Sequence, residues 1–188
     1  EKAHSVACIN GVKVSGPFAF GTEVLKNKEG GTTLTVDDAF NHVMNYTHWT
    51  PNPALMKRCL ETSKDAVAQL ESIGYSFKEV NFRFETPFIG EKGGFHLILN
   101  PLEERVPLWQ KALDDRGVTI LFNTAASNLT MKDGKPAGVV AQKDDGTKVT
   151  VNAKAVIITA GGYLGNRDLQ EKCLHTHKLT AAAGGNSL

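Results

Sequence analysis

Apolar residues recur at intervals of three and four along one long segment of the chain, and this spacing predicts an amphipathic helix. They are Met56, Cys59, Leu60, Val67, Leu70 and Ile73. Asn52 can cap this helix, Pro53 suits its first turn, and Gly74 can close it. The apolar stripe must pack against another part of the protein.

Two further helices are predicted from the residues that open them. After a Gly-rich loop ending at Gly31, Thr35 and Asp38 have the spacing of a capping box, and the helix they open is expected to end near His48. Near the other end of the sequence, Asn166 can cap a helix that runs through Leu174.

Pro107 constrains another predicted helix, which should run to Arg116 and stop at Gly117. Proline donates no backbone hydrogen bond and clashes with the preceding turn of a helix interior. We therefore expect this helix to start no earlier than about Glu103, with Pro107 in the first turn, where no donor is needed.

Shorter stretches have the composition of strands. The segment from Tyr75 to Phe84 is rich in aromatic residues and is expected to be extended, and Gly94 to Leu99 is expected to be a short strand. Farther along, three strands are predicted, separated by the turns Asp133-Gly134 and Asp144-Asp145-Gly146. These strands, Ala125 to Met131, Ala137 to Gln142 and Thr147 to Val151, form an antiparallel meander.

Two apolar runs without polar alternation flank this meander, Val118 to Phe122 and Val156 to Ala160. Such runs are typical of strands covered on both faces, as in a parallel sheet, where ligands bind at the carboxyl ends of the strands. Gly161 and Gly162 follow the second run directly and allow a ligand to approach the backbone closely. An ordinary turn between a strand and a helix has equal weight on these residues alone, because a single Gly-Gly-x-x-Gly is not specific.

Composition narrows the possible partners. The 188 residues include 21 basic and 20 acidic side chains, for a net charge of +1, which gives no electrostatic footprint for nucleic acid or an anionic membrane. No apolar run approaches the roughly 20 residues of a membrane-spanning helix. The first residues, Glu1-Lys2-Ala3-His4, are neither a start methionine nor a signal peptide, so we expect the chain to come from a longer one.

Neither a disulfide framework nor a metal site is predicted. Cys8, Cys59 and Cys173 lie far apart without Cys-x-x-Cys spacing and are interpreted as buried or incidental thiols. Cys173, His175 and His177 follow a helix end but have no fourth ligand in view, so a polar helix terminus is the better interpretation. His42, His48 and His96 are isolated and are interpreted as structural or exposed rather than catalytic.

Three stretches together resemble the fumarate reductase/succinate dehydrogenase flavoprotein family, and they occur in that family's order. They are Gly-Val-Thr-Ile-Leu-Phe-Asn-Thr-Ala-Ala-x-x-Leu from Gly117, Asp-Gly-Lys-Pro-Ala-Gly-Val-Val-Ala from Asp133, and Ala-Lys-Ala-Val-Ile-Ile-Thr-Ala-Gly-Gly from Ala153. The segments Gly16-Pro17-Phe18-Ala19 and Gln69 to Tyr75 also look like less regular members of the family. The likeness covers most of the chain.

The resemblance implies a cofactor, FAD, and a set of residues near it. Glu1-Lys2 looks like the family's pair in which an acidic residue binds the adenosine ribose. Ala125 and Ala126 match the backbone contact to adenine, and Gly16 resembles a later glycine that faces the flavin. Thr159, Ala160, Gly161 and Gly162 match the turn near the nucleotide portion, although the family usually has Ala-Thr-Gly-Gly there.

The same resemblance places the catalytic residues outside these 188 residues. The chain would be a truncated FAD-binding domain, residues 1–188, without the amino-terminal phosphate-binding loop and the carboxyl-terminal substrate-clamping domain. The parent would oxidise or reduce a small carboxylate-bearing substrate through FAD and an electron donor. We expect this chain alone to be inactive and to bind FAD weakly or not at all, because a phosphate loop and its helix N-terminus supply the main anion site.

The predicted fold class is therefore α+β, with helices, a three-stranded antiparallel meander and part of a parallel, Rossmann-like FAD-binding sheet. Two alternatives stay open: a nicotinamide-binding βαβ unit that starts at Val156, and a non-catalytic interaction or scaffold module without a cofactor. If the two apolar strands lack neighbours, their edges invite pairing between chains, so self-association is predicted.

Overall fold

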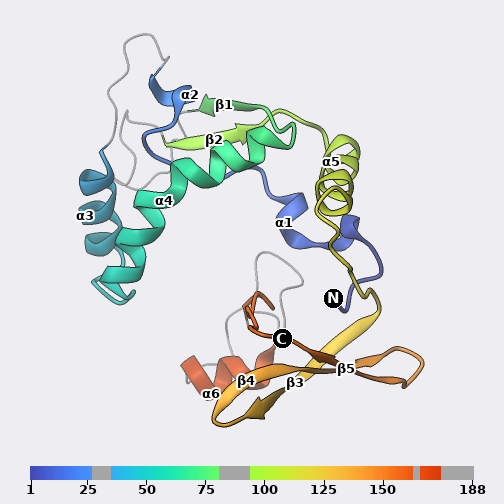
Figure 1. Ribbon diagram of the computed structural model, residues 1–188. Helices are drawn as coiled ribbons and strands as arrows, with labels where there is room; N and C mark the ends of the chain where they lie inside the picture. The colour runs from blue at the N-terminus through green and yellow to red at the C-terminus, as the bar shows by residue number, and fades with distance from the viewer. Residues whose placement is uncertain (27–34, 81–93, 163–165, 175–188) are drawn as a thin grey trace. The chain divides into compact units, whose positions relative to one another are not determined.

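The computed structural model describes residues 1–26, 35–80, 94–162 and 166–174 (Figure 1). Contacts divide the chain into two compact units, one of residues 1–10 and 120–188 and the other of residues 11–119. The helices are α1 (Asn10–Lys13), α2 (Glu23–Lys26), α3 (Val36–Tyr46), α4 (Pro53–Ser72), α5 (Leu102–Asp114) and α6 (Arg167–Leu174), and a 3-10 turn covers Val6–Cys8. The strands are β1 (Phe77–Val80), β2 (Phe95–Ile98), β3 (Thr124–Lys132), β4 (Lys135–Lys143) and β5 (Lys148–Asn152).

The unit of residues 11–119 contains a small antiparallel sheet. β1 pairs with β2, with Phe77 opposite Ile98. On the other side of β2, the N–H of His96 donates to the carbonyl of Pro17 at 2.8 Å, and the N–H of Ile98 donates to that of Ser15 at 2.9 Å. The predicted strand from Gly94 to Leu99 is confirmed. The predicted extended segment from Tyr75 to Phe84 is confirmed for β1, and its remainder lies outside the described residues.

Helices α3 and α4 form as their caps predict. The Thr35 hydroxyl accepts from the N–H of Asp38 at 3.1 Å, and the Asp38 carboxylate accepts from the N–H of Thr35 at 3.2 Å, which completes a capping box. The side-chain oxygen Oδ1 of Asn52 accepts from the N–H of Leu55 at 3.1 Å, which caps α4. The Gly-rich loop before α3 lies partly outside the described residues.

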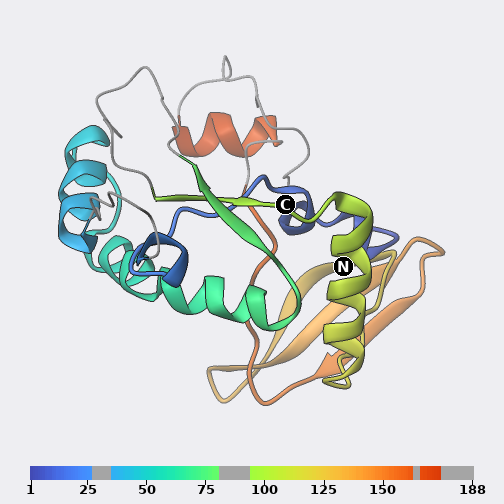
Figure 2. The same cartoon turned by 90° about the horizontal axis from the view of Figure 1, so that it is seen from above.

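The apolar stripe of α4 packs as expected. Leu60 of α4 joins Ala39 of α3 and Phe20 in a buried cluster. The N–H of Phe20 also donates to the Ser63 hydroxyl of α4 at 3.0 Å. Figure 2 shows α3 and α4 (blue to green) from above. The cluster therefore connects the two helices to the segment around Phe20, which follows the residues that pair with β2.

Helix α5 corrects the prediction for Pro107. The helix begins at Leu102, so Pro107 is its sixth residue and lies beyond the first turn. Proline there removes only the hydrogen bond to the carbonyl of Glu103, an exposed residue that water can reach. One lost bond near the start of a helix costs less than one in the middle of a buried helix, so the helix continues through the proline.

The three-stranded meander is confirmed. β3, β4 and β5 lie in that order and are all antiparallel, joined by turns at Asp133-Gly134 and Asp144-Asp145-Gly146 (Figures 1 and 2). Asp133, Gly134 and Gly146 have positive φ angles of 51°, 74° and 85°, as tight hairpin turns require. The hydrogen bonds that Asp145 accepts from Thr147 lower the pKa of its carboxyl and support the second turn.

One face of the meander is apolar. The cross-strand row Leu129, Val139 and Val151 lies on it, and so does the row Ala126, Ala141 and Val149. Ala141 is buried, but the side chains of Leu129 and Val151 are 40% and 44% exposed.

The two apolar runs that flank the meander correct a prediction. Neither Val118–Phe122 nor Val156–Ala160 forms a strand, and the side chains of Ile157 and Ile158 are 86% and 71% exposed rather than buried. A strand needs neighbours for its N–H and C=O groups, and backbone bonds of a second strand to these runs are not found in the described part of the chain.

Both sheets of the described residues are antiparallel, so the predicted partial parallel sheet is not formed within them. The α+β class itself is confirmed by the helices and the meander. No helix in the described ranges has both the length and the apolar character needed to cross a lipid bilayer. The assignment of residues 1–188 to one domain stays a prediction.

Candidate functional site

The first three residues lie against the segment that leads into β3. The terminal amino group of Glu1 donates to the carbonyl of Leu121 at 3.1 Å, and the carbonyl of Glu1 accepts from the N–H of Thr124 at 3.0 Å. The carbonyl of Ala3 accepts from the N–H of Asn123 at 3.1 Å. Residues about 120 positions apart in sequence therefore meet through backbone bonds, and Thr124 is 97% buried at this point.

The carboxylate of Glu1 stands at this junction. Its Oε1 accepts from the N–H of Ala3 at 2.9 Å, which orients the side chain, and the residue is exposed. A carboxylate offers about four lone-pair directions, so one such bond leaves others for hydroxyl donors. The arrangement suits a pair of vicinal hydroxyls, which is the hydrogen-bonding chemistry of a ribose.

Ala125 and Ala126 follow Thr124 directly at the start of β3. They pair with Gln142 and Ala141 of β4, and β3 is an edge strand of the three-stranded sheet. In an antiparallel ladder, alternate residues direct their N–H and C=O groups to the neighbouring strand, and the others direct them to the open edge. One of the two alanines therefore presents a backbone donor and acceptor to the edge, and both lack side chains that would block a flat ring. Glu1, Ala125 and Ala126 are called the amino-terminal corner below.

Thr159, Ala160, Gly161 and Gly162 are exposed and lie outside any helix or strand. Gly161 has a φ of 89°, and a Cβ at either glycine would meet no atom within 4 Å. The turn can thus accept a close neighbour. No hydrogen bond between this turn and the amino-terminal corner is found among the described residues, so the structure leaves its predicted role as a prediction.

Gly16 belongs to the other compact unit, where its glycine is required by packing. A Cβ at Gly16 would lie 1.8 Å from the backbone oxygen of His96. That close approach accounts for the glycine through the pairing of residues 15–19 with β2, and a role beside a flavin stays a prediction.

Two histidines have contacts that the sequence did not predict. His96 is fully buried, with Nε2 2.6 Å from the Thr22 hydroxyl and Nδ1 3.0 Å from the carbonyl of Gly94. The carbonyl can only accept, so Nδ1 carries a proton, and the ring fixes β2 to the segment around Thr22. This confirms a structural interpretation of His96.

His4 lies beside Cys8, with Nε2 3.3 Å from the Cys8 sulfur. The three cysteines are free, and Cys59 and Cys173 are exposed, so the incidental of the two interpretations, rather than the buried one, applies to these two. Among the described residues there is no group of three side chains able to hold a metal ion. His175 and His177 lie outside the described residues.

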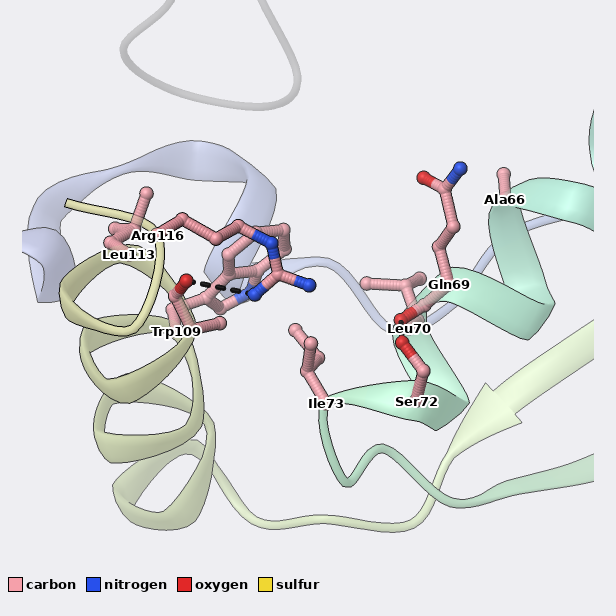
Figure 3. Close-up of a pocket in the computed structure, with 9 residues that line it drawn as sticks. Ala66, Gln69, Leu70, Ser72, Ile73, Trp109, Leu113 and Arg116 are labelled. Atoms are coloured by element: carbon pink, nitrogen blue, oxygen red, sulfur yellow. Dashed lines mark hydrogen bonds between the residues drawn. The ribbon is translucent and has the colours of Figure 1, made fainter. Parts of the chain in front are cut away.

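A cavity of about 610 Å³ lies between α4 and α5 in the unit of residues 11–119 (Figure 3). Its lining includes Leu70 from α4, Ile73 directly after α4, Trp109 from α5 and Arg116 in the turn that follows α5. The sequence did not predict it, because the helical pattern identifies apolar faces but not the gap between two of them.

Tyr75 fixes one wall of this cavity. Its hydroxyl accepts from Nε1 of Trp109 at 2.9 Å, and the two rings make an edge contact. Burial raises the pKa of Tyr75, and the hydrogen bond from Trp109 and the charge of Arg105 partly oppose that rise. Arg105 itself donates to the carbonyls of Val12, Val14 and Asn100.

Residues 1–185 match the family model described as "FAD binding domain". Vinyl phenol reductase of Lactiplantibacillus plantarum is 26% identical over 172 residues, which cover 88% of this chain and 34% of that protein. The chain therefore spans about a third of the length of this curated relative.

Two solved structures have similar folds. The open conformation of a flavocytochrome c3 fumarate reductase has a TM-score of 0.76 at 19% identity, over 92% of this chain and 30% of the other. The 3-ketosteroid-Δ4-(5α)-dehydrogenase of Rhodococcus jostii RHA1 has a TM-score of 0.69 at 17% identity, over 94% of this chain and 43% of the other.

Proposed function

Because this chain belongs to the FAD-binding domain family of flavoprotein oxidoreductases, we propose that its amino-terminal corner holds the adenosine half of FAD. In this proposal Glu1 accepts hydrogen bonds from the ribose hydroxyls. The edge of β3 at Ala125 and Ala126 offers backbone groups to the adenine ring. The turn of Thr159, Ala160, Gly161 and Gly162 accommodates the linkage toward the flavin.

The observation that carries the proposal is the backbone bonding of Glu1 to Leu121 and Thr124. It places a carboxylate next to an open strand edge, which are the two recognition elements that an adenosine needs. The charge of these residues also fits the adenosine half of FAD. The corner offers hydrogen-bond acceptors to the ribose hydroxyls and does not have to hold the phosphates. These 188 residues contain no Gly-x-Gly-x-x-Gly sequence for that purpose.

We further propose that the whole protein oxidises or reduces a small carboxylate-bearing substrate. When bound, FAD supplies hydride or electron transfer at its isoalloxazine ring. The support for a carboxylate is the similarity in fold to a fumarate reductase; the vinyl phenol reductase and the ketosteroid dehydrogenase bear names with other substrates. An anaerobic assay with a reduced viologen dye can rank fumarate, a vinyl phenol and a 3-ketosteroid as acceptors. Turnover of the vinyl phenol or the 3-ketosteroid without turnover of fumarate would refute the proposal of a carboxylate-bearing substrate.

The alternative of a scaffold module without a cofactor has no support from the comparisons, and neither does the nicotinamide-binding unit. In a scaffold module, Glu1 would act only through its backbone bonds to Leu121 and Thr124. The two functions therefore differ in one testable respect, which is whether the Glu1 carboxylate contributes to nucleotide binding.

A titration of the protein with FAD tests the adenosine site. Binding is followed by flavin fluorescence for the wild type, for Glu1→Gln and for the matched control Glu61→Gln, which removes an exposed carboxylate from α4. We expect weak binding in the millimolar range, reduced about tenfold by Glu1→Gln, since a hydrogen bond to a charged group contributes roughly 1.5 kcal/mol or more. The control should bind as the wild type does.

Two results would contradict the proposal. One is saturable FAD binding that Glu1→Gln leaves unchanged, and the other is equal loss in Glu1→Gln and Glu61→Gln. Circular dichroism of both variants distinguishes a lost contact from a lost fold, because the backbone bonds of residue 1 do not depend on its side chain.

A further inference from the structure

The cavity between α4 and α5 has an apolar interior and one cationic group at its rim. Its single charged lining residue is Arg116, and its apolar lining comprises Ala66, Leu70, Ile73, Trp109, Ala112 and Leu113. At about 610 Å³ it falls within the range of about 300–1,000 Å³ that is typical of small-molecule sites. Nothing in the proposed FAD site uses these residues.

Arg116 is held in place for a role at the rim. Its Nη1 donates to the carbonyl of Ala112 at 2.8 Å, at the carboxyl end of α5. A guanidinium has five N–H donors, so this bond leaves several for another acceptor. Figure 3 shows the Arg116 side chain extending from the turn after α5 toward Ile73 at the end of α4.

The negative charges near Arg116 do not enter the cavity. Asp115 is paired with Lys111 at 2.5 Å, and Asp114 accepts from Gln110 at 2.9 Å. Neither aspartate lines the cavity, and none of the residues that do is acidic. The electrostatics of the rim therefore favour an anion.

The indole of Trp109 is preorganised as a wall. Its N–H is bonded to the Tyr75 hydroxyl at 2.9 Å, so its ring faces stay available for apolar contact. Gly74 contributes to the same packing, because a Cβ there would lie 2.7 Å from a methyl of Leu108. The wall is thus set by the contacts of Gly74 and Tyr75, which follow α4, with Leu108 and Trp109 of α5.

From this combination we propose that the cavity binds a small amphipathic monocarboxylate, with its hydrocarbon portion against Leu70, Ile73 and Trp109 and its carboxylate on Arg116. Aliphatic and aryl carboxylates share this chemistry. The site lies in the unit of residues 11–119 and is independent of the amino-terminal corner, so either proposal can fail alone.

Decanoate is the probe, with decanol as a neutral control of the same chain length. The sequence has two tryptophans, so Trp49→Phe leaves Trp109 as the only fluorescent indole. In that background we expect decanoate to change the Trp109 emission saturably below its micelle concentration. Arg116→Gln should weaken the binding of decanoate about three- to fivefold, as expected for the loss of an exposed charge pair, and should leave the binding of decanol unchanged.

Matched variants separate the site from general effects. Arg58→Gln removes an exposed arginine of α4 that does not line the cavity and should leave decanoate binding unchanged. Ala66→Phe places a ring at the rim and should abolish binding of both probes, whereas Ala68→Phe, on the same helix outside the cavity, should not. The proposal is overturned by no saturable change in Trp109 emission, by equal effects of Arg116→Gln and Arg58→Gln, or by undiminished binding to Ala66→Phe.

Discussion

Gly138 lies in β4, the central strand of the meander. It faces Thr130 of β3 and Asn152 of β5 and is buried. A Cβ at this position would lie 2.2 Å from the backbone oxygen of Val151 and 2.9 Å from the Thr130 hydroxyl oxygen. Gly138→Ala therefore introduces a methyl group where no space exists.

The cost of this substitution follows from what would have to move. Cβ atoms essentially never approach another atom within 3.0 Å, so the gap of 2.2 Å to a backbone oxygen must widen. That oxygen belongs to a strand held by its own ladder bonds, and no flexible side chain can give way instead. Overpacking of this kind typically costs about 1–3 kcal/mol, and a backbone clash puts Gly138→Ala toward the upper end.

Urea unfolding followed by far-UV circular dichroism measures this effect. Both tryptophans lie in the unit of residues 11–119, whereas the meander belongs to the other unit, so tryptophan fluorescence does not report on the meander. Hydrogen exchange of the β4 and β5 amides provides the local measurement instead. The control is Gly162→Ala, where a Cβ meets no atom within 4 Å, and a change within about 0.5 kcal/mol is expected. The steric argument would be wrong if Gly138→Ala had the same free energy of unfolding as the wild type and unchanged hydrogen exchange of the β5 amides.

Two further predictions concern pH and association. Burial raises the pKa of Tyr75 above 10.0, so the folded protein holds the phenolic proton more tightly than the unfolded chain does. This stabilisation is complete below pH 10 and is lost as the pH rises through the folded pKa. In that range the free energy of unfolding, measured with urea, should fall more steeply for the wild type than for Tyr75→Phe. Parallel pH curves for the two proteins would contradict this. The exposure of Ile157 and Ile158 predicts self-association, so sedimentation velocity should show larger species that Ile157→Lys reduces. A monomer at high concentration would count against it.

Local signals predicted the helices and the meander because the determining contacts are near in sequence. Thr35 and Asp38 cap α3 within one turn, Asn52 and Pro53 open α4, and Asn166 accepts from the N–H of Leu169 to open α6. The turn at Asp133 needs only its own residues and those of β3 and β4.

Long-range neighbours decided the elements that the sequence predicted wrongly. Val118–Phe122 and Val156–Ala160 have the composition of buried strands, but a strand forms only where a partner supplies hydrogen bonds. Pro107 was expected in the first turn from its chemistry alone, although the cost of the missing bond depends on whether water reaches the carbonyl of Glu103.

The candidate site was predictable only in part. The resemblance identified Glu1, Ala125 and Ala126, and the structure brings Glu1 beside the start of β3 through bonds that no local pattern contains. The cavity beside Arg116 was not predictable, because it depends on how the end of α4 meets α5. Its only signal in the sequence was an arginine at the end of a helix that carries Trp109.

Recognition of adenosine by the amino-terminal corner is best tested by the amide chemical shifts of the protein on addition of ADP. We expect the largest shifts on Ala3, Thr124, Ala125 and Ala126, and we expect Glu1→Gln to diminish them. The amides around Arg116 should stay unmoved. Shifts confined to other residues, or none at millimolar ADP, would contradict the assignment of this corner while leaving membership of the FAD-binding domain family intact.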